Sequence, residues 1–227
     1  ALADLELDVA VVEASAVAGA AAAQPAYDGR VVALGHGSRL ILDALGFWPE
    51  LNDGACPIHE IQVSDRGHLG AVRLRAREEG VPALGYVTGA RLLGAAFNRA
   101  LAALPPERLY APARVVALHR EPDRAVCTLT GEGVPVRVAA RLVVAADGTD
   151  SRLRALAGIG VRERGYGQSA ITAPVTPARD PGGIAYERFT DTGPLALLPM
   201  HDGRYSLVWT VPEGQEDAIL DLDQGAF

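Results

Sequence analysis

The stretch Leu142-Val143-Val144-Ala145-Ala146-Asp147-Gly148-Thr149-Asp150-Ser151-Arg152-Leu153-Arg154 decides the fold. Its apolar run ends in Asp147-Gly148, which predicts a buried strand that carries a carboxylate to its carboxyl end. Gly148 permits a turn or a close backbone approach, and Ser151 is suited to cap a following helix. Since nucleotides bind at the carboxyl ends of strands in open α/β sheets, the stretch predicts part of a nucleotide site. The alternative is a structural role, in which Asp147 only caps the turn before Ser151.

Composition places the chain among globular proteins. It has 227 residues, of which 49% are hydrophobic and 22% are charged, enough for one large domain or two small ones. The formal net charge of −7 gives no general attraction for nucleic acid, so we expect no nucleic-acid partner. No apolar run approaches the roughly 20 residues that a membrane-spanning helix needs.

The cysteines and histidines give no metal-binding pattern. Cys56 and Cys127 lie far apart and have no Cys-x-x-Cys spacing, so a structural zinc site is not expected. We expect two reduced thiols, and a disulfide between them remains the alternative. Four histidines are too scattered along the chain for a metal site: His36, His59, His119 and His201.

The first apolar run, Asp8-Val9-Ala10-Val11-Val12-Glu13, predicts a strand that ends in a carboxylate. In a dinucleotide-binding βαβ unit the second strand ends with such an acid, which binds the ribose hydroxyls. The alternative is a strand that ends in glutamate by chance. Residues 1–7 are expected to be the end of a helix, and residues 14–29, which are rich in small residues, are expected to form a loop.

Helical patterns follow in two places. A strand over residues 30–34 leads to an amphipathic helix over residues 39–45, with Ser38 as its cap and Gly46 as its end. Four apolar residues are predicted to form the buried face of this helix: Leu40, Ile41, Ala44 and Leu45. A short extended segment over residues 85–88 precedes a longer helix, predicted over residues 89–104.

Alternating apolar and polar residues predict antiparallel strands in the rest of the chain. A hairpin is predicted from residues 58–63 and 71–77, with its turn near residues 65–67. A three-stranded meander is predicted from residues 114–118, 125–130 and 134–139. Four further strands are predicted at residues 169–175, 184–189, 195–199 and 205–211, and the acidic tail after residue 212 starts a helix.

These elements predict a mixed α/β (α+β) fold of two domains, each discontinuous in sequence. Residues 1–56 and 85–160 are expected to form a nucleotide-binding domain, with a Rossmann-like βαβ layer and the antiparallel meander. Residues 57–84 and 161–227 are expected to form a second domain on a mostly antiparallel sheet, which the hairpin joins.

Several segments together resemble the flavoprotein aromatic hydroxylases with the para-hydroxybenzoate hydroxylase fold. Asp147-Gly148-x-x-Ser151-x-x-Arg154 looks like the Asp-Gly motif of that family. Other segments are similar to ubiquinone-biosynthesis hydroxylases of the 2-octaprenyl-6-methoxyphenol hydroxylase type: residues 30–34, 37–39, 45–48, 61–68, 84–87, 166–170, 186–190 and 193–199. The resemblance spans residues 8–223 and implies that the two domains bind FAD and substrate, respectively.

The resemblance implies an FAD-dependent monooxygenase that uses NADH or NADPH and O₂. In the family a flavin C4a-hydroperoxide transfers a hydroxyl group to an activated phenol ring, here that of a polyprenylated phenol in ubiquinone biosynthesis. Such a substrate implies a cytoplasmic protein with peripheral contact to the inner membrane and to other ubiquinone-synthesis enzymes. Two alternatives are a hydroxylase of a small soluble aromatic compound and a non-catalytic flavin-fold scaffold of a ubiquinone-synthesis complex.

The resemblance assigns cofactor-binding roles to six residues: Glu13, Arg30, Arg91, Val116, Asp147 and Gly148. Glu13 matches the acid that binds the adenosine ribose, and Arg30 matches an arginine near the FAD pyrophosphate. Arg91 matches an arginine that faces the nucleotide, and Val116 matches a strand residue whose backbone binds adenine. The alternatives are solvated arginines at positions 30 and 91 and ordinary strand core at position 116.

No catalytic residue is assigned, and three candidates are His68, Gln168 and Pro199. His68 lies in the predicted hairpin, and histidine titrates near neutrality, where it can assist deprotonation of a phenol. Its alternative is an ordinary turn residue. Gln168 and Pro199 fall in segments that the family places toward the substrate sheet and the flavin ring.

Two elements of the family are expected outside this chain. The glycine-rich GxGxxG turn should precede Ala1, and a Gly-Asp motif that contacts the flavin should follow Phe227. Because backbone amides of the first turn hold the pyrophosphate, this stretch alone is expected to bind FAD weakly or not at all. We therefore expect the interior of a longer enzyme, inactive by itself.

Overall fold

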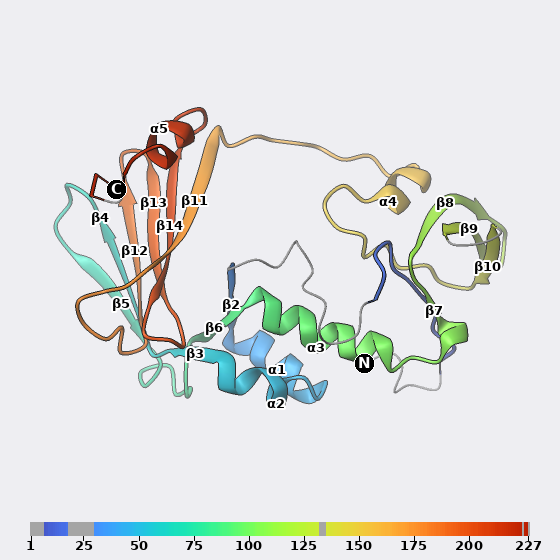
Figure 1. Ribbon diagram of the computed structural model, residues 1–227, viewed down its shortest axis with the longest axis horizontal. Helices are drawn as coiled ribbons and strands as arrows, with labels where there is room; N and C mark the ends of the chain where they lie inside the picture. Colours follow the sequence, from blue (N-terminus) through green and yellow to red (C-terminus); the bar gives the residue numbers. More distant parts are fainter. Residues whose placement is uncertain (1–6, 18–29, 132–134, 224, 227) are drawn as a thin grey trace. The chain divides into compact units, whose positions relative to one another are not determined.

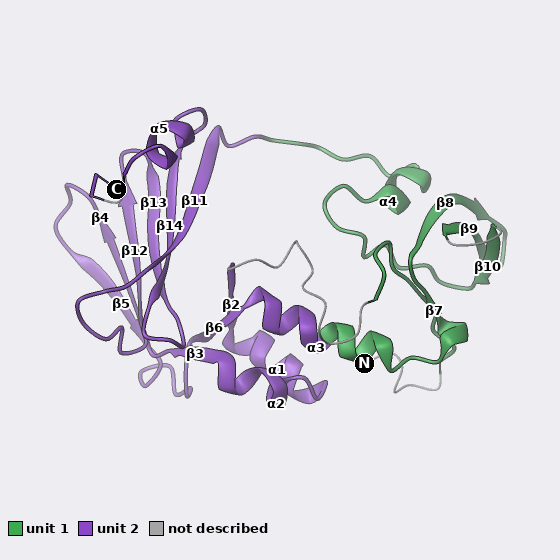
Figure 2. Cartoon of the chain, viewed as in Figure 1, with its two compact units in different colours: residues 1–22, 97–164 green, residues 23–96, 165–227 purple. Residues whose placement is uncertain are grey.

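The computed structural model describes residues 7–17, 30–131, 135–223 and 225–226 (Figure 1). The predicted helix end before residue 7 and most of the predicted loop over residues 14–29 lie outside the described residues. The chain divides into two compact units (Figure 2), unit 1 from residues 1–22 and 97–164 and unit 2 from residues 23–96 and 165–227.

Unit 1 is built on short β-structure. Strand β1 (Val11–Val12) pairs in parallel with β7 (Leu109–Tyr110), which follows the 3₁₀ turn η3 (Pro106–Arg108). The predicted three-stranded antiparallel meander is confirmed as β8 (Ala113–Arg120), β9 (Ala125–Gly131) and β10 (Val136–Ala140). A short helix, α4 (Arg152–Leu156), packs against β8.

The predicted strand before Asp147 is wrong. Residues 142–146 have no regular secondary structure, and the side chains of Leu142 and Val144 are 78% and 67% exposed. A strand is held by hydrogen bonds to a neighbouring strand, and among the described residues no strand pairs with this run. The apolar run therefore has strand composition without the partner that would bury it.

Unit 2 contains a small antiparallel sheet and the helices beside it. The sheet has the order β2 (Val31–Gly35), β6 (Gly85–Gly89), β3 (Ala55–Ile58), of which β3 was not predicted. Helix α1 (His36–Ala44) follows β2, and helix α3 (Ala90–Ala102), which ends in unit 1, follows β6. In the sequence between α1 and β3 lie α2 (Trp48–Leu51) and the 3₁₀ turn η2 (Asn52–Gly54).

The larger sheet of unit 2 has six strands, in the order β11-β14-β13-β12-β4-β5. These are β4 (Glu60–Asp65), β5 (Ala71–Arg75), β11 (Gln168–Val175), β12 (Ile184–Thr190), β13 (Gly193–Pro199) and β14 (Tyr205–Pro212). The predicted hairpin is confirmed as β4 and β5, and it joins the later strands through a parallel pairing of β4 with β12. The remaining pairs are antiparallel, and α5 (Glu216–Leu220) begins in the acidic tail.

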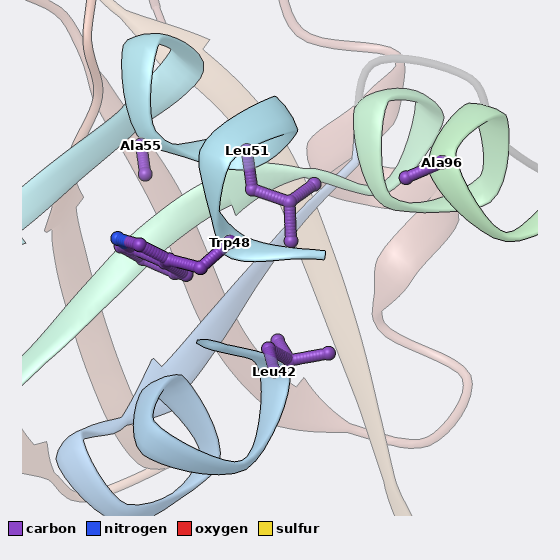
Figure 3. Packing of buried hydrophobic residues seen from close by; sticks show 5 residues of the cluster. All are labelled: Leu42, Trp48, Leu51, Ala55 and Ala96. Atoms are coloured by element: carbon purple, nitrogen blue, oxygen red, sulfur yellow. The ribbon is translucent and has the colours of Figure 1, made fainter. Parts of the chain in front are cut away.

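The core beside the small sheet gathers residues from four segments (Figure 3): Leu42, Trp48, Leu51, Ala55 and Ala96. The Tyr86 ring meets the Trp48 ring edge-on at a centroid distance of 4.7 Å. Aromatic and aliphatic burial of this kind is the main stabilising contribution that the sequence offers here.

Two predictions for the first helix are wrong. Helix α1 begins at His36 after Gly35, so Ser38 lies within the helix and does not cap it. The side chains of Leu40, Ile41 and Leu45 are 48%, 63% and 38% exposed, Ala44 is also exposed, and Leu42 is the buried residue. The buried face is the one that meets α2, and helical periodicity alone does not say which apolar face has a partner.

Replacing Leu51 with alanine should lower the free energy of unfolding of unit 2 by about 3 kcal/mol, because a fully buried leucine loses its transfer free energy and leaves a cavity. Both tryptophans lie in unit 2, so denaturation followed by tryptophan fluorescence reports on this unit. Leu45→Ala, at a side chain 38% exposed, is the control and should cost less than about 1 kcal/mol. Equal losses in both variants would contradict the assignment of this core.

Candidate functional site

Asp147 is held at the start of helix α4. Its Oδ2 accepts a hydrogen bond from the Leu153 amide at 3.0 Å, and its Oδ1 accepts one from the Ser151 hydroxyl. Ser151 Oγ accepts in turn from the Arg154 amide at 3.0 Å, which confirms Ser151 as the helix cap. Gly148, with φ of +85°, makes the turn between Asp147 and this cap.

These hydrogen bonds keep Asp147 ionised. Those from the Leu153 amide and the Ser151 hydroxyl lower the pKa of the Asp147 carboxyl group below its ordinary value. The carboxylate also lies at the positive end of the short helix dipole. The structural alternative, in which Asp147 caps the turn before Ser151, is therefore present. The carboxylate oxygens have further lone pairs that can accept hydrogen bonds from a ligand.

Unit 1 also holds Glu13 and Val116 close to strand β8. The Ala113 amide, at the start of β8, donates to the Glu13 carbonyl oxygen at 2.8 Å, while Glu13 Oε1 accepts from the Ser15 amide at 2.8 Å. The pairing of β8 with β9 shifts register between Val115 and Ala117, so Val116 is the extra residue of a β-bulge. A bulge leaves the extra residue outside the ladder, with backbone groups available to another partner.

Helix α4 is tied to the same strand, since Arg120 Nη2 donates to the Ala157 carbonyl oxygen at 3.2 Å. Unit 1 therefore brings together the end of β1, the bulge in β8 and the Asp147 cap. Four of the six residues predicted to bind the cofactor lie in this unit: Glu13, Val116, Asp147 and Gly148.

Arg30 and Arg91 lie in unit 2, at the first turn of α3. The Ala90 amide donates to the Arg30 carbonyl oxygen at 2.9 Å, which fixes Arg30 beside the amino end of that helix. Arg91 is the second residue of α3. Two guanidinium groups on backbone positions beside one helix N-terminus form a setting that suits a phosphate.

Sequence analysis missed a third residue at this place, Thr88. Its side chain is 1% exposed, and its hydroxyl has no hydrogen-bond partner among the described residues. A buried hydroxyl without a partner costs free energy that a ligand oxygen would restore. The sequence signal was a threonine at the end of a strand, directly before a helix; His36 Nδ1 and Arg39 Nε on α1 are buried and unpartnered in the same way.

The structure does not bring the three catalytic candidates together. Gln168 is opposite Pro212 at one end of β14, whereas Pro199 is opposite Tyr205 at its other end. Gln168 is exposed and Pro199 is fully buried. His68 lies at the tip of the β4–β5 hairpin, where its Nδ1 is 2.8 Å from Asp65 Oδ2 and its side chain is 77% exposed.

The cysteines are unpaired, and Cys127 is buried whereas Cys56 is half-buried. Burial raises the pKa of both thiols, which keeps them protonated near neutral pH. Within the described ranges no group of three or more His, Cys, Asp and Glu side chains could hold a metal ion. The helices in that part of the chain are too short or too polar to cross a membrane.

Acid should weaken the cap of α4. Because the folded pKa of Asp147 is lowered, its contribution is complete above about pH 4, the ordinary carboxyl range, and is lost as the pH falls through the lowered pKa. Asp147→Asn should remove this pH dependence and lower the protection factors of the α4 amides about fivefold at pH 7. Hydrogen exchange measures both effects, with Asp150→Asn as the control. Unchanged pH dependence in Asp147→Asn would count against the cap.

Comparisons with known proteins give consistent relatives, although no known family profile matches the chain. Ubiquinone hydroxylase UbiL of Rhodospirillum rubrum is 41% identical over 201 residues, which is 88% of this chain and 46% of the relative. The 3-demethoxyubiquinol 3-hydroxylase of Escherichia coli is 35% identical over 182 residues, 80% of this chain and 46% of the relative. The chain thus spans about half the length of the curated relatives that it matches.

Solved structures show the fold. Klebsiella pneumoniae HpxO complexed with FAD and uric acid matches 81% of this chain and 47% of its own, with a TM-score of 0.62 and 17% identity. The p-nitrophenol 4-monooxygenase PnpA of Pseudomonas putida matches 97% of this chain and 54% of its own, with a TM-score of 0.69 and 13% identity. The expected mixed α/β fold of the FAD-binding monooxygenases is confirmed. The chain is therefore homologous to about half of these ubiquinone hydroxylases, and its fold is that of FAD-dependent aromatic hydroxylases and monooxygenases.

Proposed function

We propose that this chain works in an FAD-dependent monooxygenase that hydroxylates the ring of a polyprenylated phenol in ubiquinone biosynthesis, with NADH or NADPH and O₂. The observation that carries the proposal is the 41% identity to a ubiquinone hydroxylase over 88% of the chain. When bound, FAD would accept a hydride from the nicotinamide cofactor and activate O₂. The protein residues bind, orient and shield the reactants.

The residues of unit 1 fit the adenosine part of FAD. Glu13 uses Oε1 for the Ser15 amide, so Oε2 is available for a ribose hydroxyl. The bulge at Val116 offers backbone groups of the kind that adenine recognises. Asp147 and Gly148 contribute a fixed carboxylate and a turn without a side chain.

The residues of unit 2 fit a pyrophosphate. Arg30 and Arg91 supply guanidinium groups, which pair well with phosphate oxygens, at the first turn of a 13-residue helix. Thr88 adds a buried hydroxyl without a partner. We propose that this group contacts the cofactor, and we assign residues 1–56 and 85–160 to the FAD-binding domain.

The six-stranded sheet of unit 2 suits an aromatic substrate, and we assign residues 57–84 and 161–227 to the substrate domain. The strand register puts Leu195 opposite Trp209 and Leu197 opposite Leu207, so these four side chains share one face. An apolar face of this kind is the usual lining of a site for a ring compound. Among the catalytic candidates, Gln168 and His68 lie toward one end of this sheet and Pro199 toward the other.

Peripheral contact with the inner membrane is supported by the β4–β5 hairpin. Leu69 at its tip is fully exposed, and Val72 and Leu74 on β5 are 59% and 44% exposed. Over residues 60–75 three arginines stand against two acids, a net charge of +1 in a chain of net charge −7. An apolar tip with excess positive charge suits the surface of an anionic bilayer.

Thr88→Val should separate a cofactor role from an ordinary core position. Removal of an unpartnered buried hydroxyl should raise the melting temperature, while the affinity for FAD should fall about tenfold. Titration of the full-length enzyme with FAD, followed by flavin fluorescence, measures the affinity, with the exposed Thr172→Val as the control. A raised melting temperature with unchanged FAD affinity would remove Thr88 from the proposed site, and absence of any FAD binding by the full-length enzyme would remove the cofactor assignment.

Leu69→Ser should weaken membrane contact without affecting the fold, since the side chain is fully exposed. Its partition onto vesicles of phosphatidylcholine and phosphatidylglycerol should fall about tenfold, as expected for one leucine withdrawn from an apolar phase. Cosedimentation measures the partition, and Leu220→Ser on α5, 62% exposed, is the matched control. Equal partition of wild type and Leu69→Ser would argue against docking through this hairpin.

A further inference from the structure

A groove of about 490 Å³ lies at the base of the β4–β5 hairpin, within unit 2. Val81, Pro82 and Ile184 contribute an apolar surface to it. Four polar side chains surround this surface: His59, Glu60, Arg75 and Arg77. The volume is in the range of small-molecule sites, and none of the residues proposed above for cofactor, substrate or catalysis lines the groove.

One wall of the groove is a fixed ion pair. Arg75 Nε donates to Glu60 Oε2 at 3.0 Å, and Arg75 Nη1 donates to Glu78 Oε1 at 2.9 Å. Gln62 Nε2 holds the other Glu60 oxygen at 2.8 Å. Hydrogen bonds from Arg75 and Gln62 lower the pKa of Glu60, so the pair is ionised at neutral pH. The charge of Glu60 is therefore neutralised, and Arg75 Nη2 keeps donors without a partner among the described residues.

The His59 ring, which also lines the groove, is held in place. The His59 amide donates to the Gly183 carbonyl oxygen at 2.7 Å, and the Ala76 amide donates to the His59 carbonyl oxygen at 2.9 Å. A Cβ atom at Gly183 would lie 2.7 Å from His59 Cδ2, and Gly183 has φ of +71°. Only glycine permits this contact between backbone and imidazole. The ring is thus packed against the loop before β12.

Arg77 supplies a positive charge that no carboxylate in the described part of the chain neutralises. No other side chain in the described part of the chain pairs with its guanidinium group, and the His59 imidazole is likewise without a partner there. Glu60 and Glu78 are balanced by Arg75 and by Arg73, whose Nε is 3.9 Å from Glu60 Oε1. Arg77 therefore gives the groove a net positive charge in a chain of net charge −7. Arg77, Arg75 Nη2 and the imidazole are hydrogen-bond donors beside an apolar surface, which suits an anion attached to an apolar body.

We propose that this groove is a second ligand site, which binds a small organic anion: a carboxylate or a phosphate monoester on an apolar body. The anionic group pairs with Arg77 and the free Arg75 donor, and the apolar body lies on Val81, Pro82 and Ile184. The site is separate from the proposed flavin reaction, because none of the residues proposed to bind the cofactor, contact the substrate or act in catalysis lines the groove.

Calorimetric titration of the chain with phenyl phosphate, benzoate and phenol tests this proposal. At least one of the two anions should bind with one-to-one stoichiometry, and the anion that binds more tightly identifies the preferred group, whereas neutral phenol should bind at least about tenfold more weakly. Arg77→Gln should weaken binding of that anion about tenfold, as expected for loss of a charge-assisted hydrogen bond. Arg179→Gln, at an exposed arginine elsewhere in unit 2, is the matched control and should bind like wild type.

Three results would overturn the proposal: no saturable binding of either anion, equal binding by Arg77→Gln and wild type, or an equal loss in Arg179→Gln, which would indicate general charge attraction. Thermal denaturation should show that Arg77→Gln remains folded, as expected for a change at an exposed side chain. No flavin takes part in the titration, so its outcome is separate from the test of the proposed monooxygenase.

Discussion

The parallel pairing of β4 with β12 is the constraint on which unit 2 depends. It aligns Glu60 with Ile184 and continues to Asp65 and Phe189, so two segments more than 100 residues apart form adjacent strands. The β4–β5 hairpin and the β12–β13–β14 strands form through short connections, but only this pairing joins the hairpin to the later strands in one six-stranded sheet. Such a long-range contact must offset the entropy of closing a large loop, and burial of Ile58, Val87 and Ala185 beside it supplies apolar stabilisation.

The same pairing creates both surfaces to which we assign ligands in this unit. At one end, the Arg66 amide donates to the Phe189 carbonyl oxygen at 2.9 Å, which ties the hairpin tip with Leu69 to the sheet. At the other end, Glu60 meets the loop at Gly183, and the groove with Arg77 forms there. A membrane-facing tip and an anion-binding groove at opposite ends of one strand pair would allow a soluble metabolite and a lipid surface to act on the same sheet.

Asp147 and Thr88 differ in the exposure of their side chains and in whether their polar atoms have hydrogen-bond partners. Asp147 is exposed, and its oxygens are satisfied by the amide of Leu153 and the hydroxyl of Ser151. Thr88 is buried and has no partner in the described part of the chain. An unsatisfied buried group is the stronger pointer to a missing ligand, because its cost in the free protein is removed on binding. The Asp-Gly motif is therefore the better family signature, and Thr88 is the better physical evidence for a site.

Periodicity and turn residues predicted the local elements well: the meander, the β4–β5 hairpin, the strands of the large sheet and the Ser151 cap. These depend on neighbours in sequence, and alternation or a capping residue is enough to specify them. Three features failed for one reason. In each case the structure depends on which distant segment packs alongside, and an apolar pattern does not indicate which segment that is. The three features are the run over residues 142–146, the buried face of α1 and strand β3.

The sequence by itself indicated the resemblance to flavoprotein hydroxylases, through motifs whose residue types are set by chemistry, and it indicated most of the strands and helices in their order. Only the tertiary structure decided that Val116 is a bulge, that Thr88 lacks a partner beside Arg30 and Arg91, and that Arg77 faces a groove whose other charges cancel. Whether a polar group is hydrogen-bonded and whether a side chain is buried depend on neighbours in space. Both can be determined only once the pairing of distant strands, such as β4 with β12, is known.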